Sequence, residues 1–293
     1  MNIQFNSLSN RPLRQLDKLI FNHMDAWGVT AVIVATALSI HQLISAKTIF
    51  LLTIITLTYW FGFAINDFYD RKHDLIEPQK AARNYFIQTS FPPTLFHIFL
   101  LIITVSLLFA FYQFGWRGIL MFAGGFFIAW AYSAPPFRLK SRPLVDLITH
   151  GLFVESFPYL LVLFILNVQW QAIDVVILSS LFFASVASQL EQQARDFGVD
   201  SQSDTNFTVR FGLGWNRPLM ILSTSFLIST ICYGLFSGII PLIYSPFAAI
   251  MLPLLIHRFI RGSQPRSEQW VKILTAVAIV YAIFLVIQTG LSQ

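Results

Sequence analysis

The 293-residue sequence has few charged residues and a single cysteine. Lys, Arg, Asp and Glu make up only 11% of the chain, whereas about 25% is typical of proteins in solution. This shortage of charge excludes an ordinary soluble domain, and a mean hydropathy of +0.66 indicates an integral membrane protein. Cys232 has no second cysteine with which to form a disulfide. The sequence also lacks a basic stripe interleaved with aromatic residues, which argues against a nucleic-acid-binding module.

Long apolar segments fill most of the chain. We predict an all-α protein with nine membrane-spanning helices, each close to the length that a helix needs to cross the hydrocarbon layer. The predicted spans are Trp27–Ser45, Thr48–Ile65, Leu95–Phe114, Gly118–Tyr132, Leu147–Val168, Ile173–Leu190, Leu219–Phe236, Gly238–Ile256 and Ile273–Thr289. Residues 1–26 form an N-terminal segment that we expect to contain an interfacial helix, and residues 27–293 form a single transmembrane domain.

The basic residues are distributed unevenly between the two sets of connecting loops. Only Lys47 and Arg117 fall in the short loops on one side, which leaves 17 of the 19 Lys and Arg residues on the other. Because positively charged loops stay in the cytoplasm, we predict a cytoplasmic N-terminus. With nine spans, the C-terminus then lies on the opposite side of the membrane.

Two acidic clusters follow the second and sixth predicted spans, on the cytoplasmic side. They comprise Asn66, Asp67, Asp70 and Asp74 in the first cluster, and Asp196, Asp200 and Asp204 in the second. If each helix continues past its span, the aspartates of a cluster share one helix face. Like charges on one face repel one another unless cations lie between them. Ligands that are all oxygen suit Mg²⁺, which commonly binds phosphates as well. The alternative is a pair of solvated helix ends.

Basic residues accompany both clusters, and one acid lies deep in a span. Arg71 follows the first cluster, Arg138 and Lys140 lie in the loop after the fourth span, and Arg195 precedes Asp196. Guanidinium and ammonium groups near a metal are what a departing diphosphate requires, although the cytoplasmic excess of positive charge explains most of them equally well. Glu155 falls inside the fifth span, where an acid is a functional candidate. It could accept a proton or anchor a hydrogen bond.

Three motifs in order resemble those of the UbiA-type intramembrane prenyltransferases. The first is Asn66-Asp67-x-x-Asp70-x-x-x-Asp74, and the second is Arg195-Asp196-x-x-x-Asp200-x-x-x-Asp204. Between them, residues 132–143 resemble the loop that many members carry. The second motif and this loop look most like the carotenoid-elongating branch, whereas the first motif is also similar to the chlorophyll-synthase branch. Many members have glycine where Asp204 stands.

This resemblance implies a helical bundle around a central cavity and Mg²⁺-dependent transfer of an isoprenyl group from its diphosphate to an apolar acceptor in the membrane. It implies that the aspartates and Asn66 hold metal and diphosphate. Catalytic roles are expected for Asp70, Asp196, Tyr132, Lys140 and Glu155, and binding of the diphosphate for Asn66, Arg71, Arg138, Lys140 and Arg195. The acceptor would be a quinone precursor, a carotenoid or a chlorophyllide-like molecule.

Two other functions remain open at this stage. A terpene cyclase of the same superfamily would use the same diphosphate site without an acceptor. A membrane transporter is the alternative from a different class, but it would place charges within several spans, whereas here the acids gather at the cytoplasmic ends.

Overall fold

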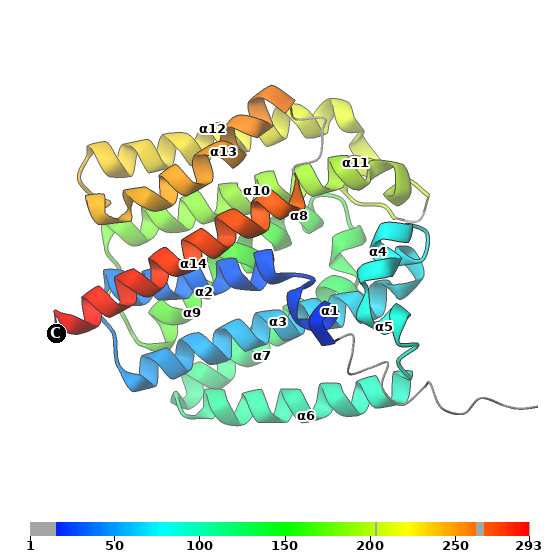
Figure 1. Cartoon of the computed structure of the whole chain (residues 1–293), viewed down its shortest axis with the longest axis horizontal. Coiled ribbons are helices and arrows are strands. Elements are labelled where there is room, and N and C mark those ends of the chain that lie inside the picture. The colour runs from blue at the N-terminus through cyan, green and yellow to red at the C-terminus, as the bar shows by residue number, and fades with distance from the viewer. Residues whose placement is uncertain (1–15, 203, 262–266, 293) are drawn as a thin grey trace, which may run out of the picture.

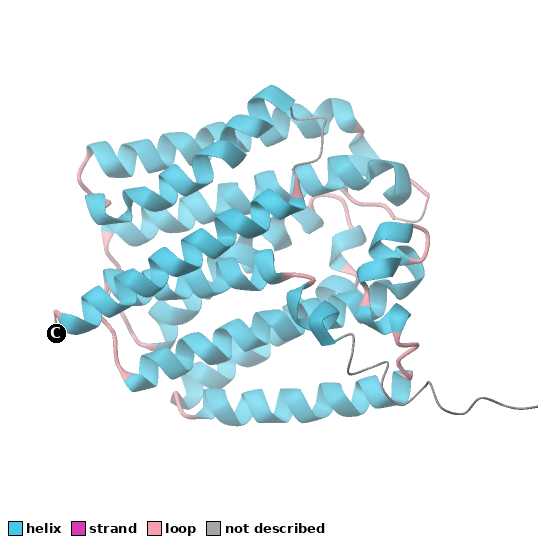
Figure 2. Ribbon diagram, in the orientation of Figure 1, coloured by secondary structure: helices cyan, strands magenta, loops and turns pink. Residues whose placement is uncertain are grey.

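The computed structural model describes residues 16–202, 204–261 and 267–292, and within these ranges the chain consists of helices and loops (Figure 2). The all-α fold predicted from the sequence is therefore confirmed. The elements are α1 (Leu16–Phe21), α2 (Met24–Ile40), α3 (Ala46–Asp74), α4 (Pro78–Arg83), α5 (Tyr85–Gln88), α6 (Pro93–Tyr112), α7 (Gly115–Ser133), η2 (Leu139–Ser141), α8 (Val145–His150), η3 (Gly151–Ser156), α9 (Phe157–Ile165), α10 (Ala172–Asp200), α11 (Phe207–Phe211), α12 (Leu213–Phe236), η4 (Leu242–Tyr244), α13 (Ser245–Arg261) and α14 (Glu268–Leu291).

Each of the nine predicted spans overlaps a helical segment, but the segments differ in length and apolar character. Seven segments within the described residues are long and apolar enough to cross a membrane: Ala46–Asp74, Pro93–Tyr112, Val145–Ile165, Ala172–Asp200, Leu213–Phe236, Leu242–Ile260 and Gln269–Leu291. The helix α2 is apolar but has only 17 residues, and α7 falls outside this group despite its 19 residues. The count of nine spans therefore stays a prediction.

The helices α3 and α10 are longer than a membrane requires. Each has 29 residues, which corresponds to about 44 Å at the α-helical rise, whereas the hydrocarbon layer is about 30 Å thick. A reciprocal cap between Ser45 and Thr48 begins α3, and Asp174 caps the start of α10 in the same way. Because each helix starts at the opposite face of the bundle, its last two to three turns exceed the length needed to cross the hydrocarbon layer. The prediction that the second span continues as a helix past Ile65 is confirmed.

These two long helices belong to different parts of the bundle. The helix α3 packs against α2, α6 and α7, whereas α10 packs against α12 and the segment η3. Short helices α1, α4, α5 and α11 gather at the end of the bundle where α3 and α10 terminate, and the C-terminal end of α14 lies at the other end (Figure 1). The C-terminal ends of α3 and α10 thus lie at the same end of the bundle.

The N-terminal segment differs in detail from the prediction. Residues 1–15 lie outside the described residues, and the part of the predicted interfacial helix that is described is α1, only six residues long. The helix α2, which overlaps the first predicted span, begins at Met24, three residues before Trp27, directly after the short loop that follows α1.

A buried polar cluster holds together three helices at the end of the bundle away from the acidic clusters. The carboxylate of Asp174 is fully buried. Its Oδ1 lies 2.8 Å from Nε2 of His41 and accepts a hydrogen bond of 2.7 Å from the hydroxyl of Tyr159. Its Oδ2 accepts from the backbone amide of Gln171 at 2.7 Å. The cluster joins α2, α9 and α10 where α10 begins.

We expect Asp174→Ala to destabilise the protein by about 3 kcal/mol, because removing one member of a buried pair leaves its polar partners without hydrogen bonds. Thermal unfolding of the purified protein in detergent measures this. Asp17→Ala is the matched control, since Asp17 is exposed on α1. Equal unfolding temperatures for the two variants would contradict the role of the cluster.

The nine-span topology makes a separate prediction about the two ends of the chain. A tag fused before Met1 should be protected in sealed, right-side-out cells, and a tag fused after Gln293 should be accessible from outside. Antibody labelling before and after permeabilisation measures both. A protected C-terminal tag would show that the number of spans is even.

Candidate functional site

A cavity of about 820 Å³ occupies the centre of the bundle. All seven residues of the two predicted acidic clusters line it: Asn66, Asp67, Asp70, Asp74, Asp196, Asp200 and Asp204. Further along, the lining is mostly apolar and includes Val29, Phe63, Phe153, Ile177 and Leu235. The cavity is therefore acidic at the end where α3 and α10 terminate and mostly apolar elsewhere. Tertiary folding unites two clusters that are about 130 residues apart in sequence.

The carboxylates lie at the helix ends that favour them least. Asp70 and Asp74 occupy the last turns of α3, and Asp196 and Asp200 the last turns of α10. A helix C-terminus already carries partial negative charge from its free carbonyl groups, so it stabilises cations and not anions. Four carboxylates at two such ends require positive charge nearby, from side chains or from bound cations.

The loop after α7 supplies positive charge to the end of α3. Nζ of Lys140 contacts the carboxylate of Asp70 and lies 2.9 Å from Oδ1 of Asn66. The same oxygen of Asn66 accepts a hydrogen bond of 2.6 Å from the hydroxyl of Ser133. The Arg138 guanidinium donates to Oδ1 of Asp70 over 3.3 Å. Lys140 and Arg138, both predicted to bind diphosphate, thus converge on the first cluster.

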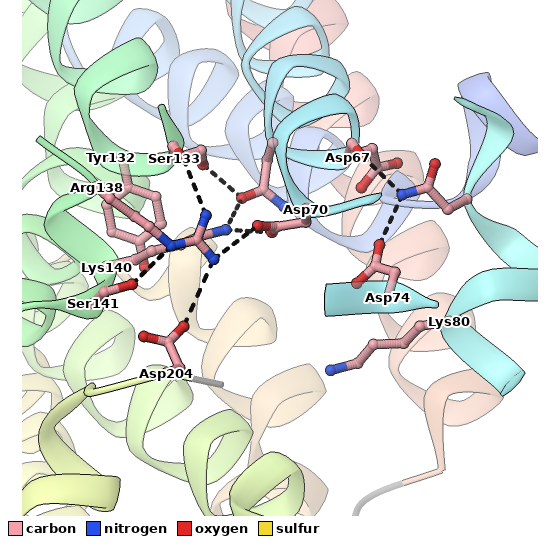
Figure 3. A network of polar contacts seen from close by, with 12 residues as sticks. Asp67, Asp70, Asp74, Lys80, Tyr132, Ser133, Arg138, Lys140, Ser141 and Asp204 are labelled. Carbon is pink, nitrogen blue, oxygen red and sulfur yellow. Dashed lines mark hydrogen bonds and ion pairs between the residues drawn. The ribbon is translucent and has the colours of Figure 1, made fainter. Parts of the chain in front are cut away.

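Arg138 also connects the first cluster to the second. Its Nη2 lies 3.8 Å from Oδ2 of Asp204, and Figure 3 shows the guanidinium between Asp70 and Asp204. Its Nε donates to the hydroxyl of Ser141 at 2.9 Å. The backbone of Arg138 is left-handed, with φ of 39°, a conformation uncommon outside glycine. The turn therefore aims the guanidinium at the acidic end of the cavity.

The position of Asp204 corrects one expectation. We predicted that Asp196, Asp200 and Asp204 share one helix face, but α10 ends at Asp200 and Asp204 lies in the following loop. The side chain of Asn206 donates to Oδ2 of Asp200 at 2.8 Å, which turns the chain back over the helix end. Asp204 still lines the cavity, but the loop and not helical periodicity brings it there.

On the other wall, Lys80 connects the short helix α4 to α10. Its ammonium group lies 2.9 Å from Oδ2 of Asp196 and 3.2 Å from Oε2 of Glu77. Burial lowers the pKa of Lys80, but the carboxylates of Asp196 and Glu77 more than offset this and raise the pKa above its ordinary value. Nε of Arg195 lies 3.0 Å from the second oxygen of Asp196. Asp196 is thus held between two cationic side chains.

Asp67 and Asp74 have different surroundings. Oδ1 of Asp67 lies 2.8 Å from Nε2 of His23, and its Oδ2 accepts from Asn22 at 3.1 Å. Burial lowers the pKa of His23, whereas the carboxylate of Asp67 raises it, with a net increase. Nδ2 of Asn84 donates to Oδ2 of Asp74 at 2.7 Å and to the backbone carbonyl of Asp67 at 2.8 Å. Asp67 therefore attaches the N-terminal loop, the two residues Asn22 and His23 between α1 and α2, to α3.

The remaining predicted residues divide into two groups. Tyr132 lines the cavity and its hydroxyl accepts a hydrogen bond of 3.3 Å from Gln189. Glu155 lines the cavity from the π-helical segment η3, a type of turn often found at functional sites. Arg71 is placed elsewhere: its guanidinium stacks 3.8 Å above the ring of Phe68 and its Nε donates to the Phe68 carbonyl. Arg71 therefore does not line the acidic end of the cavity.

Carboxylate and amide oxygens at the acidic end suit a hard cation such as Mg²⁺. Within residues 16–202, 204–261 and 267–292, no three Asp, Glu, His or Cys side chains stand close enough to form a metal site by themselves. Instead, the carboxylates of Asp70 and Asp196 are neutralised by Lys140 and Lys80. The donor chemistry fits a divalent cation that is bound together with further oxygen ligands, as Mg²⁺ commonly is.

Several contributors were not predicted from the sequence. Ser133, Asn84 and His23 contact the acidic residues through contacts between distant segments, which no local pattern reveals. Lys80 is different, because Pro78 at the first turn of α4 signals a short helix that starts there. Pro78 could therefore have predicted that Lys80 lies on a short helix after the first cluster, but not that Lys80 contacts α10.

Comparison with known proteins completes this description. No curated protein sequence matches the chain. Among solved structures, a UbiA homolog from Archaeoglobus fulgidus bound to DMAPP and Mg²⁺ superposes with a TM-score of 0.72 at 18% identity, covering 92% of this chain and 99% of the other. The same homolog bound to GPP and Mg²⁺ gives 0.70 at 17% identity, with 93% and 99% covered.

A UbiA homolog from Aeropyrum pernix K1, in its apo form, gives a TM-score of 0.67 at 12% identity, over 89% of this chain and 97% of the other. At these identities the structures establish a shared fold. The sequence model of the UbiA prenyltransferase family matches residues 28–286, nearly the whole chain. The chain therefore belongs to the UbiA prenyltransferase family.

Proposed function

We propose that the protein transfers an isoprenyl group from a prenyl diphosphate to an apolar acceptor dissolved in the membrane, in a Mg²⁺-dependent reaction. The observation that carries this proposal is the cavity, whose acidic end bears cationic side chains and whose remaining walls are mostly apolar. Such a cavity matches a substrate with a charged head and a hydrocarbon tail. The Archaeoglobus homolog was solved with DMAPP or GPP together with Mg²⁺.

The cationic side chains would hold the diphosphate. Arg138 and Lys140 approach from the loop after α7, and Lys80 and Arg195 from the opposite wall. When the allylic C–O bond breaks, its electron pair leaves with the diphosphate, and fixed donors around that group stabilise the growing negative charge. The guanidinium of Arg138 suits phosphate oxygens because it presents several donors in one plane.

The residues that would hold Mg²⁺ are Asn66, Asp70, Asp74, Asp196 and Asp200, from the two helix ends. Bound there, Mg²⁺ would neutralise charge on the leaving diphosphate. The contacts of Asp67 with His23 and Asn22 favour a role in fixing the N-terminal loop. Asp204 would orient Arg138, with which it forms an ion pair.

The apolar walls would protect the allylic cation. A cavity lined by apolar side chains excludes water, which would otherwise capture the cation. Aromatic faces stabilise positive charge, and the rings of Tyr59, Phe63 and Phe153 belong to the lining. The π electrons of the acceptor then form the new C–C bond.

We also propose nine spans with the acidic end in the cytoplasm, where a charged diphosphate is dissolved.

The sequence motifs leave a terpene cyclase as the alternative within the same superfamily. A cyclase would convert a prenyl diphosphate alone into a hydrocarbon, whereas a transferase would require an acceptor. Incubation of the purified protein with Mg²⁺ and geranyl diphosphate, with and without membrane lipid extract, distinguishes the two by mass spectrometry of the products. A prenylated lipid that forms only with the extract supports transfer.

Asp70→Asn and Asp196→Asn should each lower turnover at least about 100-fold, because each removes a charge from the end where the diphosphate and Mg²⁺ would bind. Diphosphate release from geranyl diphosphate measures turnover. Asp17→Asn, an exposed residue of α1, is the control. Full activity of both site variants, with expression and unfolding temperature unchanged, would remove the proposed site.

Lys140→Met should raise the KM for geranyl diphosphate and lower kcat, with kcat/KM reduced about 100-fold, since Lys140 contacts both Asn66 and Asp70. Lys47→Met is a control, because Lys47 lies at the beginning of α3, at the opposite end of that helix from Asn66 and Asp70. Steady-state kinetics of the three proteins check this. Equal losses for both variants would show a general effect on folding.

A further inference from the structure

His150 lies in the wall of the cavity, at a place that the proposed diphosphate site does not use. It is the last residue of α8, directly before the π-helical segment η3, and it lines the cavity. Its Nδ1 lies 2.8 Å from the hydroxyl oxygen of Ser185 on α10. The same hydroxyl donates a hydrogen bond of 2.8 Å to the backbone carbonyl of His150.

These two contacts determine which nitrogen of the imidazole carries the proton. A serine hydroxyl has one proton, and the Ser185 proton is donated to a carbonyl oxygen, which can only accept. The contact with Nδ1 therefore requires Nδ1–H to donate to Ser185. In the neutral imidazole, the other nitrogen is then an acceptor. His150 thus has a basic lone pair on Nε2.

No hydrogen-bond partner within the described part of the chain occupies Nε2. Nε2 is also not among the buried polar atoms that lack a hydrogen bond in the described residues, so it is accessible and not sealed in the protein interior. Since His150 borders the cavity, Nε2 opens onto that space. His23 also lines the cavity, but its Nε2 contacts the carboxylate of Asp67.

The depth of His150 separates it from the diphosphate end. Its partner Ser185 precedes Asp196 by eleven residues on α10, which corresponds to about 16 Å along the helix axis. An imidazole at that level is too far away to contact a diphosphate held at Asp196. It lies instead beside the hydrocarbon part of the cavity.

We propose that His150 is a catalytic base that accepts a proton after the new C–C bond has formed. This inference rests on the proposed prenyl transfer. Attack by the acceptor's π bond on the allylic carbon leaves a cation on the acceptor. Nε2 takes a proton from the carbon next to that cation, and the C–H electron pair becomes the new double bond. Nδ1–H keeps its hydrogen bond to Ser185 throughout, so the imidazolium forms without rearrangement of its partners.

His150→Asn tests this role, because the asparagine amide nitrogen can replace Nδ1–H toward Ser185 while the base at Nε2 is lost. Purified protein is incubated with Mg²⁺, geranyl diphosphate and membrane lipid extract, and both released diphosphate and prenylated lipid are measured. We expect diphosphate release within about threefold of wild type, and at least a tenfold lower ratio of prenylated lipid to diphosphate. The prenylated cation that loses no proton is captured by water instead, so a prenylated lipid heavier by one water molecule should increase.

His97→Asn is the matched control, since His97 is exposed on α6, and its product ratio should equal that of wild type. An unchanged ratio in His150→Asn would overturn the assignment. So would a parallel loss of diphosphate release and product, which would indicate a role in binding or folding. A wild-type protein that releases no diphosphate would overturn prenyl transfer itself, and this role with it.

A second measurement does not depend on turnover. Diethyl pyrocarbonate acylates imidazole nitrogens that carry a lone pair, and mass spectrometry of the peptides locates the label. We expect labelling of His150 in the wild-type protein and its suppression by geranyl diphosphate with Mg²⁺, which would fill the cavity. Labelling that the substrate leaves unchanged, or no labelling at all, would contradict an open Nε2 in the substrate cavity.

Discussion

Negative charge at the C-terminal ends of two long helices is the constraint on which the site depends. The partial charge of a helix C-terminus opposes the carboxylates of Asp70 and Asp196, so the fold must supply cations to that region. It does so through Lys140 and Arg138 from one loop and Lys80 from a short helix. Elements far apart in the sequence are thereby gathered over one end of the cavity. An arrangement that is unfavourable for an isolated helix becomes tolerable once these cations surround it, and it suits the proposed binding of a diphosphate with Mg²⁺.

The two ends of α10 illustrate two different uses of a buried acid. At its beginning, Asp174 is surrounded by His41, Tyr159 and a backbone amide, so its hydrogen bonds are complete and it holds the bundle together. At its end, Asp196 is held by the flexible ammonium group of Lys80 and by Arg195, partners that can exchange for a ligand. Asp174 and Asp196 are both buried, but they differ in the kind of side chain that contacts them. Long cationic side chains leave a carboxylate available, whereas short rigid partners do not.

Sequence reasoning succeeded where a local pattern carried the information. Helical spacing predicted that α3 continues through the first cluster with Asp67, Asp70 and Asp74 on one face, and the continuation of the helix to Asp74 is confirmed. The same reasoning was wrong for Asp204, because hydrogen bonding between Asn206 and Asp200 accompanies a turn that periodicity does not reveal. Arg71 looked equivalent to the other basic residues, but stacking on Phe68 takes it away from the cavity. No sequence motif singles out His150, because its contact with Ser185 joins residues that are 35 positions apart.

The sequence by itself determined that the chain is a helical membrane protein of the UbiA type with carboxylates clustered near the ends of two helices. Hydropathy, residue spacing and the three motifs are local properties, and each is readable from neighbouring residues. The tertiary structure alone decided which cation neutralises which carboxylate, which acids hold the N-terminal loop, and which imidazole nitrogen opens onto the cavity. These depend on contacts between segments that are far apart in the chain, and hydrogen bonds and ion pairs form only at distances of a few ångströms.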